Sequence, residues 1–190
     1  MQFIFYQRIG NFQYNFWGLA IFEVIIAIII STKLLDLPLL FGYVLYFLYC
    51  ILIGLLISVI FLVFDIKTIY ETFGITSLTF LVMSIYGFIT KRDLSSIGST
   101  LFCGLLAIIF GSIFNLLFRN PLVDWIITYV GIVVFTILIA YDTQKIKKLN
   151  ELGNDGTDEN TKEAILGAFT LYLDFINLFL RLLKARGSKK

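Results

Sequence analysis

The chain has 190 residues, of which 59% are hydrophobic and only 15% are charged, and its net charge is +2 at pH 7. A soluble domain is about one-quarter charged, so this composition excludes a water-soluble globular protein and indicates that lipid is the solvent for most of the surface. The small net charge, with basic residues in short clusters between apolar stretches, also excludes nucleic acid as a partner.

The first fourteen residues are polar at several positions and lack the apolar core of a secretory signal, so we expect no cleaved leader. These positions are Gln2, Gln7, Arg8, Asn11 and Gln13.

Six apolar runs then follow one another along the chain. A spanning helix needs about 20 mainly apolar residues, and helix is the local structure that pairs its own backbone groups in hydrocarbon. The runs cover residues 16–32, 39–64, 73–90, 97–118, 122–141 and 164–183. The sequence therefore predicts an all-α, polytopic transmembrane helical bundle with six spans, which forms a single transmembrane domain over residues 1–190.

One connection is longer than the others and is rich in Asn, Asp and Gly, at residues 149–161. Asn160 followed by Glu163 has the spacing of a capping box, so we expect the last helix to start there. The acidic residues Asp155, Asp158 and Glu159 do not follow the spacing of an EF-hand. We therefore expect a solvated loop and not a calcium loop.

The distribution of basic residues between the two sides of the bundle predicts its orientation. One side of the predicted bundle has three basic residues, Arg8, Lys67 and Arg119, and the other side has more. The side with more basic residues is predicted to be cytoplasmic, which places Met1 outside. The basic tail would then also lie outside, against this rule. Either the last apolar segment is a re-entrant hairpin that returns to the cytoplasm, or the earlier spans outweigh these late positive charges. The side with more basic residues has Lys33, Lys91, Arg92, Lys145, Lys147, Lys148 and Lys162, and the tail has Arg181, Lys184, Arg186, Lys189 and Lys190.

Asp174 lies in the middle of the last apolar run. An ionised side chain at the centre of a membrane helix costs on the order of 2.5–3.5 kcal/mol, so this aspartate needs a partner or water. Thr170, Asn177 and Arg181 share its helical face and form a polar stripe with it. We expect the stripe to face the interior of the bundle or a water-filled path.

Asp142 ends the fifth run, a position where an aspartate can be merely solvated. If Asp142 meets Asp174, the two carboxyl groups cannot both ionise cheaply and would share one proton. Such a pair is a switch that responds to acid pH, and carboxyl groups are the natural choice here because the chain has no histidine. Glu23, inside the first run, and Lys33, near its end, are candidates for pairing with the two aspartates.

The remaining residue types point to structure and not to a cofactor. Cys50 and Cys103 lie in separate apolar stretches, and without histidine they do not make a zinc site, so we expect no cofactor. The glycines inside the runs are predicted to allow close helix packing instead of marking a ligand site. They are Gly42, Gly54, Gly87, Gly104, Gly111 and Gly131.

Two stretches have recognisable motifs, residues 168–179 (AFTLYLDFINLF) and residues 141–146 (YDTQKI). They resemble the terminal signature and the penultimate-helix motif of the Bax inhibitor family of membrane proteins (transmembrane BAX inhibitor motif proteins), especially its bacterial branch. Residues 72–76, and residues 90–95 with Gly98, resemble its central region. The surroundings of Glu23 resemble its acidic second helix. The resemblance covers most of the chain.

This resemblance implies a helical bundle with the last helix at its centre and a calcium leak whose activity responds to pH. Asp142 and Asp174 occupy the positions of the family's paired-aspartate sensor, where calcium and protons would compete for the carboxyl groups. It also implies an integral protein of the bacterial plasma membrane, with lipid, calcium ions and protons as partners.

This sequence departs from the family's pattern at two points. It has seven spans where we count six, and we expect the difference to lie before residue 16. Its closed state has a basic residue that latches onto the aspartate pair. Here Lys33 is the nearest base, and because lysine is a point charge without a planar fork, we expect a weaker latch.

Two other functions fit parts of the sequence. Intramembrane aspartyl proteases also pair a Tyr-Asp on one helix with an Asp on the next. However, Tyr172 and Leu173 stand where those proteases have glycines before the second aspartate, so we do not expect an enzyme. A membrane regulator that transports nothing, and binds stress or quality-control proteins in the membrane, stays open as the alternative.

Overall fold

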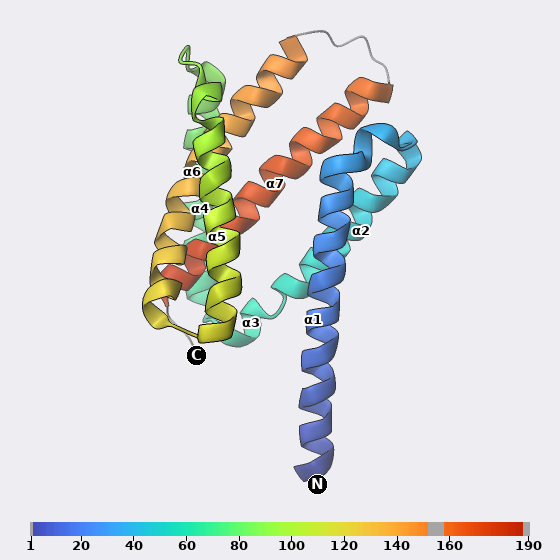
Figure 1. The fold of residues 1–190 in the computed structure, drawn as a ribbon, viewed down its shortest axis with the longest axis vertical. Helices are drawn as coiled ribbons and strands as arrows, with labels where there is room; N and C mark the ends of the chain where they lie inside the picture. Colours follow the sequence, from blue (N-terminus) through green and yellow to red (C-terminus); the bar gives the residue numbers. More distant parts are fainter. Residues whose placement is uncertain (1, 152–157, 188–190) are drawn as a thin grey trace. The chain divides into compact units, whose positions relative to one another are not determined.

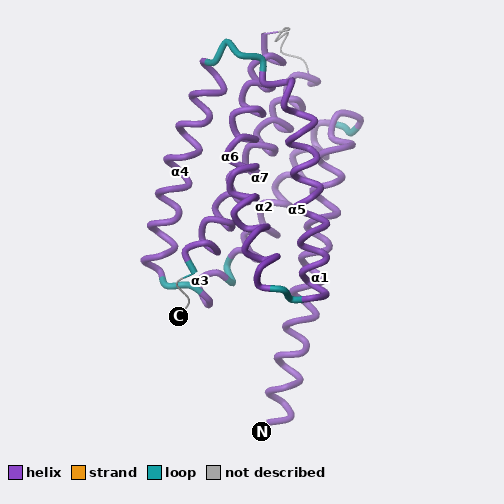
Figure 2. Tube along the Cα trace, turned by 60° about the vertical axis from the view of Figure 1, so that its left-hand side comes forward, coloured by secondary structure: helices purple, strands orange, loops and turns teal. Residues whose placement is uncertain are grey.

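The computed structural model describes residues 2–151 and 158–187. Every regular element among them is a helix, and no strand is found in this part of the chain, as Figure 2 shows. This confirms the predicted all-α class. The described residues divide into two units.

The first unit contains the N-terminal helices together with the start of the last helix. In Figure 1, α1 and α2 run antiparallel, and the short α3 follows α2. The turn between α1 and α2 contains Pro38, which directly precedes α2. The elements are α1 (Gln2–Lys33), the 3-10 helix η1 (Leu34–Asp36), α2 (Leu39–Ile57), α3 (Ile60–Val63) and the first residues of α7 (Asp158–Arg186).

The α1–α2 turn is held by close packing and by a bond from α7. Leu34 is almost completely buried, and a Cβ atom added to Gly42 would lie only 2.8 Å from Cδ1 of Leu34. Lys162, in the first turns of α7, donates a hydrogen bond from Nζ to the carbonyl oxygen of Leu35 at 3.0 Å. The start of α7 is therefore tied to the α1–α2 turn.

The second unit contains the central helices together with the rest of α7 from Gly167 onward. Its core joins Ile108 of α5, Phe135 and Ile139 of α6, and Leu178 of α7. Phe175 of α7 also makes edge contacts with aromatic rings of α4, so α7 both contributes to this core and contacts α4. The elements are α4 (Ile66–Ile89), the 3-10 helix η2 (Leu94–Ile97), α5 (Gly98–Phe118) and α6 (Pro121–Glu151).

Six helices among the described residues are long and apolar enough to cross a membrane, which confirms the predicted number of spans. Large apolar side chains remain exposed on their outer faces, such as Leu40, Leu62 and Leu117. Exposed apolar surface on this scale requires lipid as the solvent. The spans are Gly18–Asp36, Leu39–Val63, Ile66–Ile89, Leu94–Phe118, Pro121–Leu149 and Asp158–Arg186.

Four helices, α1, α4, α6 and α7, extend well beyond the predicted runs. α1 begins at Gln2 and not at residue 16, α4 begins at Ile66 and not at residue 73, and α6 continues to Glu151, past residue 141. The physical reason is that an apolar run measures only the hydrocarbon thickness. A helix can continue into the polar interface, where water and charged side chains satisfy its ends.

The structure of α7 contradicts two further predictions. It begins at Asp158, so Asn160 lies inside its first turn, and the predicted capping box at Asn160 and Glu163 is wrong. It is also one continuous helix of 29 residues, which contradicts a re-entrant hairpin. The orientation of the chain in the membrane stays a prediction, as does the single transmembrane domain. Asp155, in the predicted loop, lies outside the described residues.

Candidate functional site

The two aspartates singled out by the sequence meet in the second unit. Asp142 of α6 and Asp174 of α7 are both buried, with 8% and 5% of their surface exposed. Their carboxyl groups form a side-chain hydrogen bond with each other. The fold therefore brings together two acidic side chains that lie on consecutive spans.

This contact requires a proton. An ionised carboxylate only accepts hydrogen bonds, so a bond between two carboxyl groups exists only if one of them is protonated. Oδ2 of Asp174 is buried and accepts no bond from an N–H or hydroxyl donor in the structure. Two carboxyl groups in such contact can share one proton.

Close helix packing positions the α6 side of the pair. Two residues before Asp142, the backbone of Ala140 packs directly on Gly87 of α4. The next residue, Tyr141, places its ring against Gly98 at the start of α5. Because both contacts involve a glycine, α6 lies closer to its neighbours here than side chains would otherwise allow.

On α7, Asp174 lies between completely buried apolar residues. Phe169 and Leu178, which precede and follow it by about one turn, are both 0% exposed. Gly167, at the start of this part of α7, packs on Ile146 of α6. The Asp174 carboxyl group is therefore itself buried, and Asp142 is its polar partner.

The end of α6 beyond Asp142 is bonded to the α4–α5 connection. Gln144 is buried, and its Oε1 accepts a hydrogen bond from the backbone N–H of Leu94 at 2.8 Å. Its Nε2 donates to the carbonyl oxygen of Arg92, also at 2.8 Å. Lys147 donates to the carbonyl oxygen of Phe88 at 3.0 Å, near the C-terminus of α4. These bonds hold the α4–α5 connection over the end of the site.

An ion pair completes this connection at the surface. Lys148 of α6 pairs with Asp93, whose side chain also caps η2 by accepting from the backbone N–H of Ser95 at 3.1 Å. The hydrogen bond from Lys148, together with those from Ser95, holds the pKa of the Asp93 carboxyl well below its usual range. The sequence pattern singled out neither Asp93 nor Gln144 as a functional residue. A glutamine two residues after a membrane-embedded aspartate was the signal available.

The other residues of the predicted polar stripe on α7 have separate partners. Asn177 donates from Nδ2 to the carbonyl oxygen of Leu173 at 2.9 Å, within its own helix. Arg181 lies farther along α7, where its Nη1 donates to the carbonyl oxygen of Ile127 at 3.4 Å. Their role in supporting the aspartate pair stays a prediction.

The two supporting residues predicted on α1 belong to the first unit. Glu23 is half-buried there. Lys33 pairs with Asp36 across 3.7 Å, and both side chains are largely exposed. The predicted pairing of Glu23 or Lys33 with the aspartates, including the latch, stays a prediction.

The aspartate pair is also limited as a metal site. No group of three or more His, Cys, Asp or Glu side chains that could hold a metal ion occurs within residues 2–151 and 158–187. Two carboxyl groups supply at most four oxygen ligands, whereas calcium takes six to eight. Water or backbone carbonyl oxygens would have to complete the coordination of a calcium ion at Asp142 and Asp174.

Comparison with known proteins adds the following similarities. A family model described as "Inhibitor of apoptosis-promoting Bax1" matches residues 1–190. The inner membrane protein YbhL of Escherichia coli is 42% identical over 174 residues, which cover 91% of this chain and 74% of YbhL. An uncharacterized protein of Borreliella burgdorferi is 43% identical over 146 residues, covering 77% of this chain and 63% of that protein. An uncharacterized membrane protein of Streptococcus pyogenes serotype M1 is 31% identical over 177 residues, covering 90% and 74%.

Proposed function

Because this chain belongs to the Bax inhibitor family and is an integral protein of the bacterial plasma membrane, we propose that it is a pH-sensitive calcium leak. Asp142 and Asp174 form its sensor, and calcium ions and protons are the species that they bind. The proposal assigns no catalytic step to the protein and requires no resident cofactor.

The observation that carries this proposal is the buried hydrogen bond between the two carboxyl groups. With one shared proton, the pair joins α6 to α7. Loss of that proton leaves two negative charges in contact in a poorly hydrated place, where their repulsion is barely screened. The contact between α6 and α7 is therefore sensitive to proton concentration at the point where both helices are buried.

Calcium enters the proposal as a competitor for the same oxygens. A deprotonated pair offers up to four carboxylate oxygens, including Oδ2 of Asp174, which accepts no bond from an N–H or hydroxyl donor. A site with so few protein ligands binds calcium weakly and releases it readily, because affinity rises with the number of charged ligands and the rigidity of the site. Weak binding suits passage of an ion better than storage.

The test is calcium entry into proteoliposomes that contain the purified full chain and an indicator dye, measured across a range of pH. We expect flux that depends on pH, and a loss of that dependence in Asp142→Asn and Asp174→Asn. Asp65→Asn is the matched control, because Asp65 is exposed and makes no side-chain bond at the start of α4. It should retain the pH dependence.

Two outcomes would reject this function. Flux equal to that of empty liposomes at every pH would favour a regulator that transports nothing, and binding partners should then be recovered from membranes. Flux that is unchanged by Asp174→Asn would leave a leak but remove the aspartate pair as its sensor.

A further inference from the structure

A second polar site lies at the other end of α6. A pocket of about 530 Å³ opens beside the α5–α6 turn. Asp142 lies about 21 residues beyond Pro121, the first residue of α6, which is roughly 30 Å along the helix. Side chains from α5, α6 and α7 line the pocket. They include Asn115, Arg119, Asp124, Arg181 and Lys184.

The α5–α6 turn gives the pocket a fixed frame. Arg119, the last residue before the turn, has a left-handed backbone (φ 49°, ψ 42°) that ends α5. Asn120 then caps α6 by accepting from the backbone N–H of Leu122 at 2.9 Å. Pro121, which has no N–H to satisfy, occupies the first position of α6. The pocket is thus bounded by a turn that sequence and backbone both specify.

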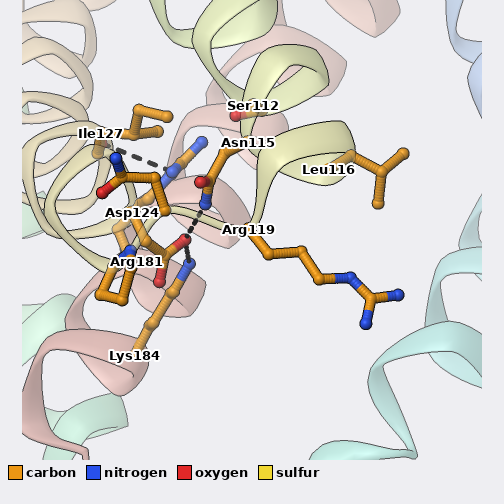
Figure 3. Close-up of a pocket in the computed structure, with 10 residues that line it drawn as sticks. Ser112, Asn115, Leu116, Arg119, Asp124, Ile127, Arg181 and Lys184 are labelled. Atoms are coloured by element: carbon orange, nitrogen blue, oxygen red, sulfur yellow. Dashed lines mark hydrogen bonds and ion pairs between the residues drawn. The ribbon is translucent and has the colours of Figure 1, made fainter.

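The charge of the pocket is positive. Arg119, Arg181 and Lys184 line it, and Asp124 is its one acidic lining residue. Asp124 is already engaged, because its Oδ1 accepts from Nδ2 of Asn115 at 3.0 Å and from Nζ of Lys184 at 2.5 Å. Figure 3 shows these three side chains pointing toward one another, whereas Arg119 extends away from them. Asp124 also attracts Arg181, but one carboxylate faces three cations, so the pocket keeps a net positive charge.

Arg181 has hydrogen-bonding capacity that the structure does not use. A guanidinium has five N–H donors, yet the bond that Arg181 makes is one contact of 3.4 Å to the carbonyl oxygen of Ile127. Its side chain is half-buried and packs on Gly131. Nearby, Oδ1 of Asn115 is buried without a donor. The pocket therefore contains a guanidinium with unused N–H donors, on Arg181, beside a buried amide oxygen that accepts no hydrogen bond, on Asn115.

The pocket lies at the depth of lipid headgroups. The spans Leu94–Phe118 and Pro121–Leu149 end and begin at this turn. Trp125 and Tyr129 on α6 are exposed, and their rings lie 4.6 Å apart. Exposed Trp and Tyr side chains of spanning helices gather at the membrane–water interface. The charged residues of the pocket thus lie where phosphate groups of lipids are abundant.

We propose that this pocket binds a phosphate group, supplied by the headgroup of an anionic phospholipid, with Arg181 and Lys184 as its charged donors. A headgroup that also carries a hydroxyl, such as phosphoglycerol, satisfies Oδ1 of Asn115 as well. The planar fork of arginine matches two phosphate oxygens at once. This site is separate from the aspartate pair and does not depend on the calcium leak.

Native mass spectrometry of the purified full chain in detergent tests the proposal, with phosphatidylglycerol, phosphatidylcholine or inorganic phosphate added. We expect the chain to retain phosphatidylglycerol in preference to phosphatidylcholine. Arg181→Gln should weaken that binding by about tenfold or more, which corresponds to the loss of about 1.4 kcal/mol of binding energy. Arg181→Lys should bind phosphatidylglycerol more weakly than the unaltered chain but more tightly than Arg181→Gln, because lysine keeps the charge but lacks the planar fork of arginine.

Lys67→Gln is the matched control. It removes one positive charge at the start of α4, from a side chain that is 87% exposed and lies outside the pocket. It should bind phosphatidylglycerol as the unaltered chain does. If Arg181→Gln does not fold, Lys184→Gln carries the test, because the Lys184 side chain is 46% exposed and tolerates replacement better.

The lipid and the free ion are told apart by comparing the ligands. Binding of inorganic phosphate that is lost in Arg181→Gln, with no preference for phosphatidylglycerol, would keep the phosphate site and overturn its lipid occupant. Equal retention of every ligand by the unaltered chain, Arg181→Gln and Lys184→Gln would overturn the site itself.

Discussion

Gly87 of α4 and Ala140 of α6 are in backbone contact: a Cβ atom on Gly87 would lie 2.2 Å from the carbonyl oxygen of Ala140. That distance is far inside van der Waals contact, and a helix backbone cannot move aside as a flexible side chain can. Since Ala140 is two residues before Asp142, the absence of a side chain at position 87 decides how closely α6 approaches α4 beside the aspartate pair.

Gly87→Ala should therefore destabilise the protein by about 1–3 kcal/mol or more, as overpacking of a dense core does. Thermal unfolding in detergent, followed by circular dichroism, measures the effect. Gly54→Ala is the control, because nothing lies within 4 Å of a Cβ at that position in α2, and alanine is the better helix former by roughly 1 kcal/mol. A midpoint for Gly87→Ala equal to that of Gly54→Ala would contradict the close contact.

Gln144→Leu should destabilise the protein by about 1–3 kcal/mol. The substitution keeps the approximate volume but leaves the N–H of Leu94 and the carbonyl of Arg92 without their partner. Thr136→Val is a suitable control because the Thr136 hydroxyl bonds a carbonyl within its own helix. Proteolysis of the α4–α5 connection should also become faster in Gln144→Leu and not in Thr136→Val. Equal rates would show that Gln144 does not hold this connection.

Asp93 should make the stability of the second unit depend on pH. Its pKa is lowered in the folded protein by Lys148 and Ser95 from an ordinary value of 3.8. A lowered folded pKa means that the stabilisation is fully present above the unfolded value and is lost as pH falls below it toward the folded pKa. Asp93→Asn should thus be less stable than the unaltered chain at pH 7, and the difference should shrink as the pH drops below about 3.8.

The same measurement on Asp36→Asn provides the comparison for Asp93. Asp36 also pairs with a lysine, Lys33, across 3.7 Å and with both partners exposed. The Asp93 pair is exposed as well, but it is closer, and Asp93 also accepts from Ser95. Exposed ion pairs of this kind contribute about 0–1 kcal/mol. Chemical unfolding curves at several pH values should separate the two variants. A difference between Asp93→Asn and the unaltered chain that stays constant from pH 7 to low pH would refute the role of the Asp93 carboxylate.

Asp142→Ala and Asp174→Ala should be strongly non-additive in the free energy of unfolding. Each single change leaves one buried carboxyl group without its partner, whereas the double change removes both. Residues in direct contact couple by about 0.5–3 kcal/mol. Unfolding of the three variants and the unaltered chain closes the double-mutant cycle, and free energies that simply add would mean that the two carboxyl groups do not interact.

Much of the fold could be predicted from the sequence because crossing hydrocarbon imposes a strong local rule. Twenty apolar residues must be helical wherever they lie, so the number of spans was correct. The predicted ends of the helices were not correct. α6, for example, continues to Glu151 through a polar stretch whose bonding partners are far away in the sequence. The pair of Asp142 and Asp174 could be predicted from the cost of an isolated charge in lipid together with the family motifs.

The remaining contacts could not be predicted, because they join residues that are far apart in the chain. Gln144 bonds residues 50 and 52 positions away, and Lys184 bonds Asp124 across 60 positions. No periodicity within a helix specifies such partners. Arg181 illustrates the limit: its spacing placed it on the face of Asp174, but the structure gives it Ile127 and Gly131 as neighbours.

The continuity of α7 has a mechanical consequence. Asp174 and Arg181 lie two turns apart on one unbroken helix, one bonded to Asp142 and the other to the backbone of Ile127, both on α6. A sliding or rotation of α7 that parts the carboxyl groups also displaces the guanidinium relative to α6 by a similar amount. Neither end can rearrange by itself unless the helix bends between them.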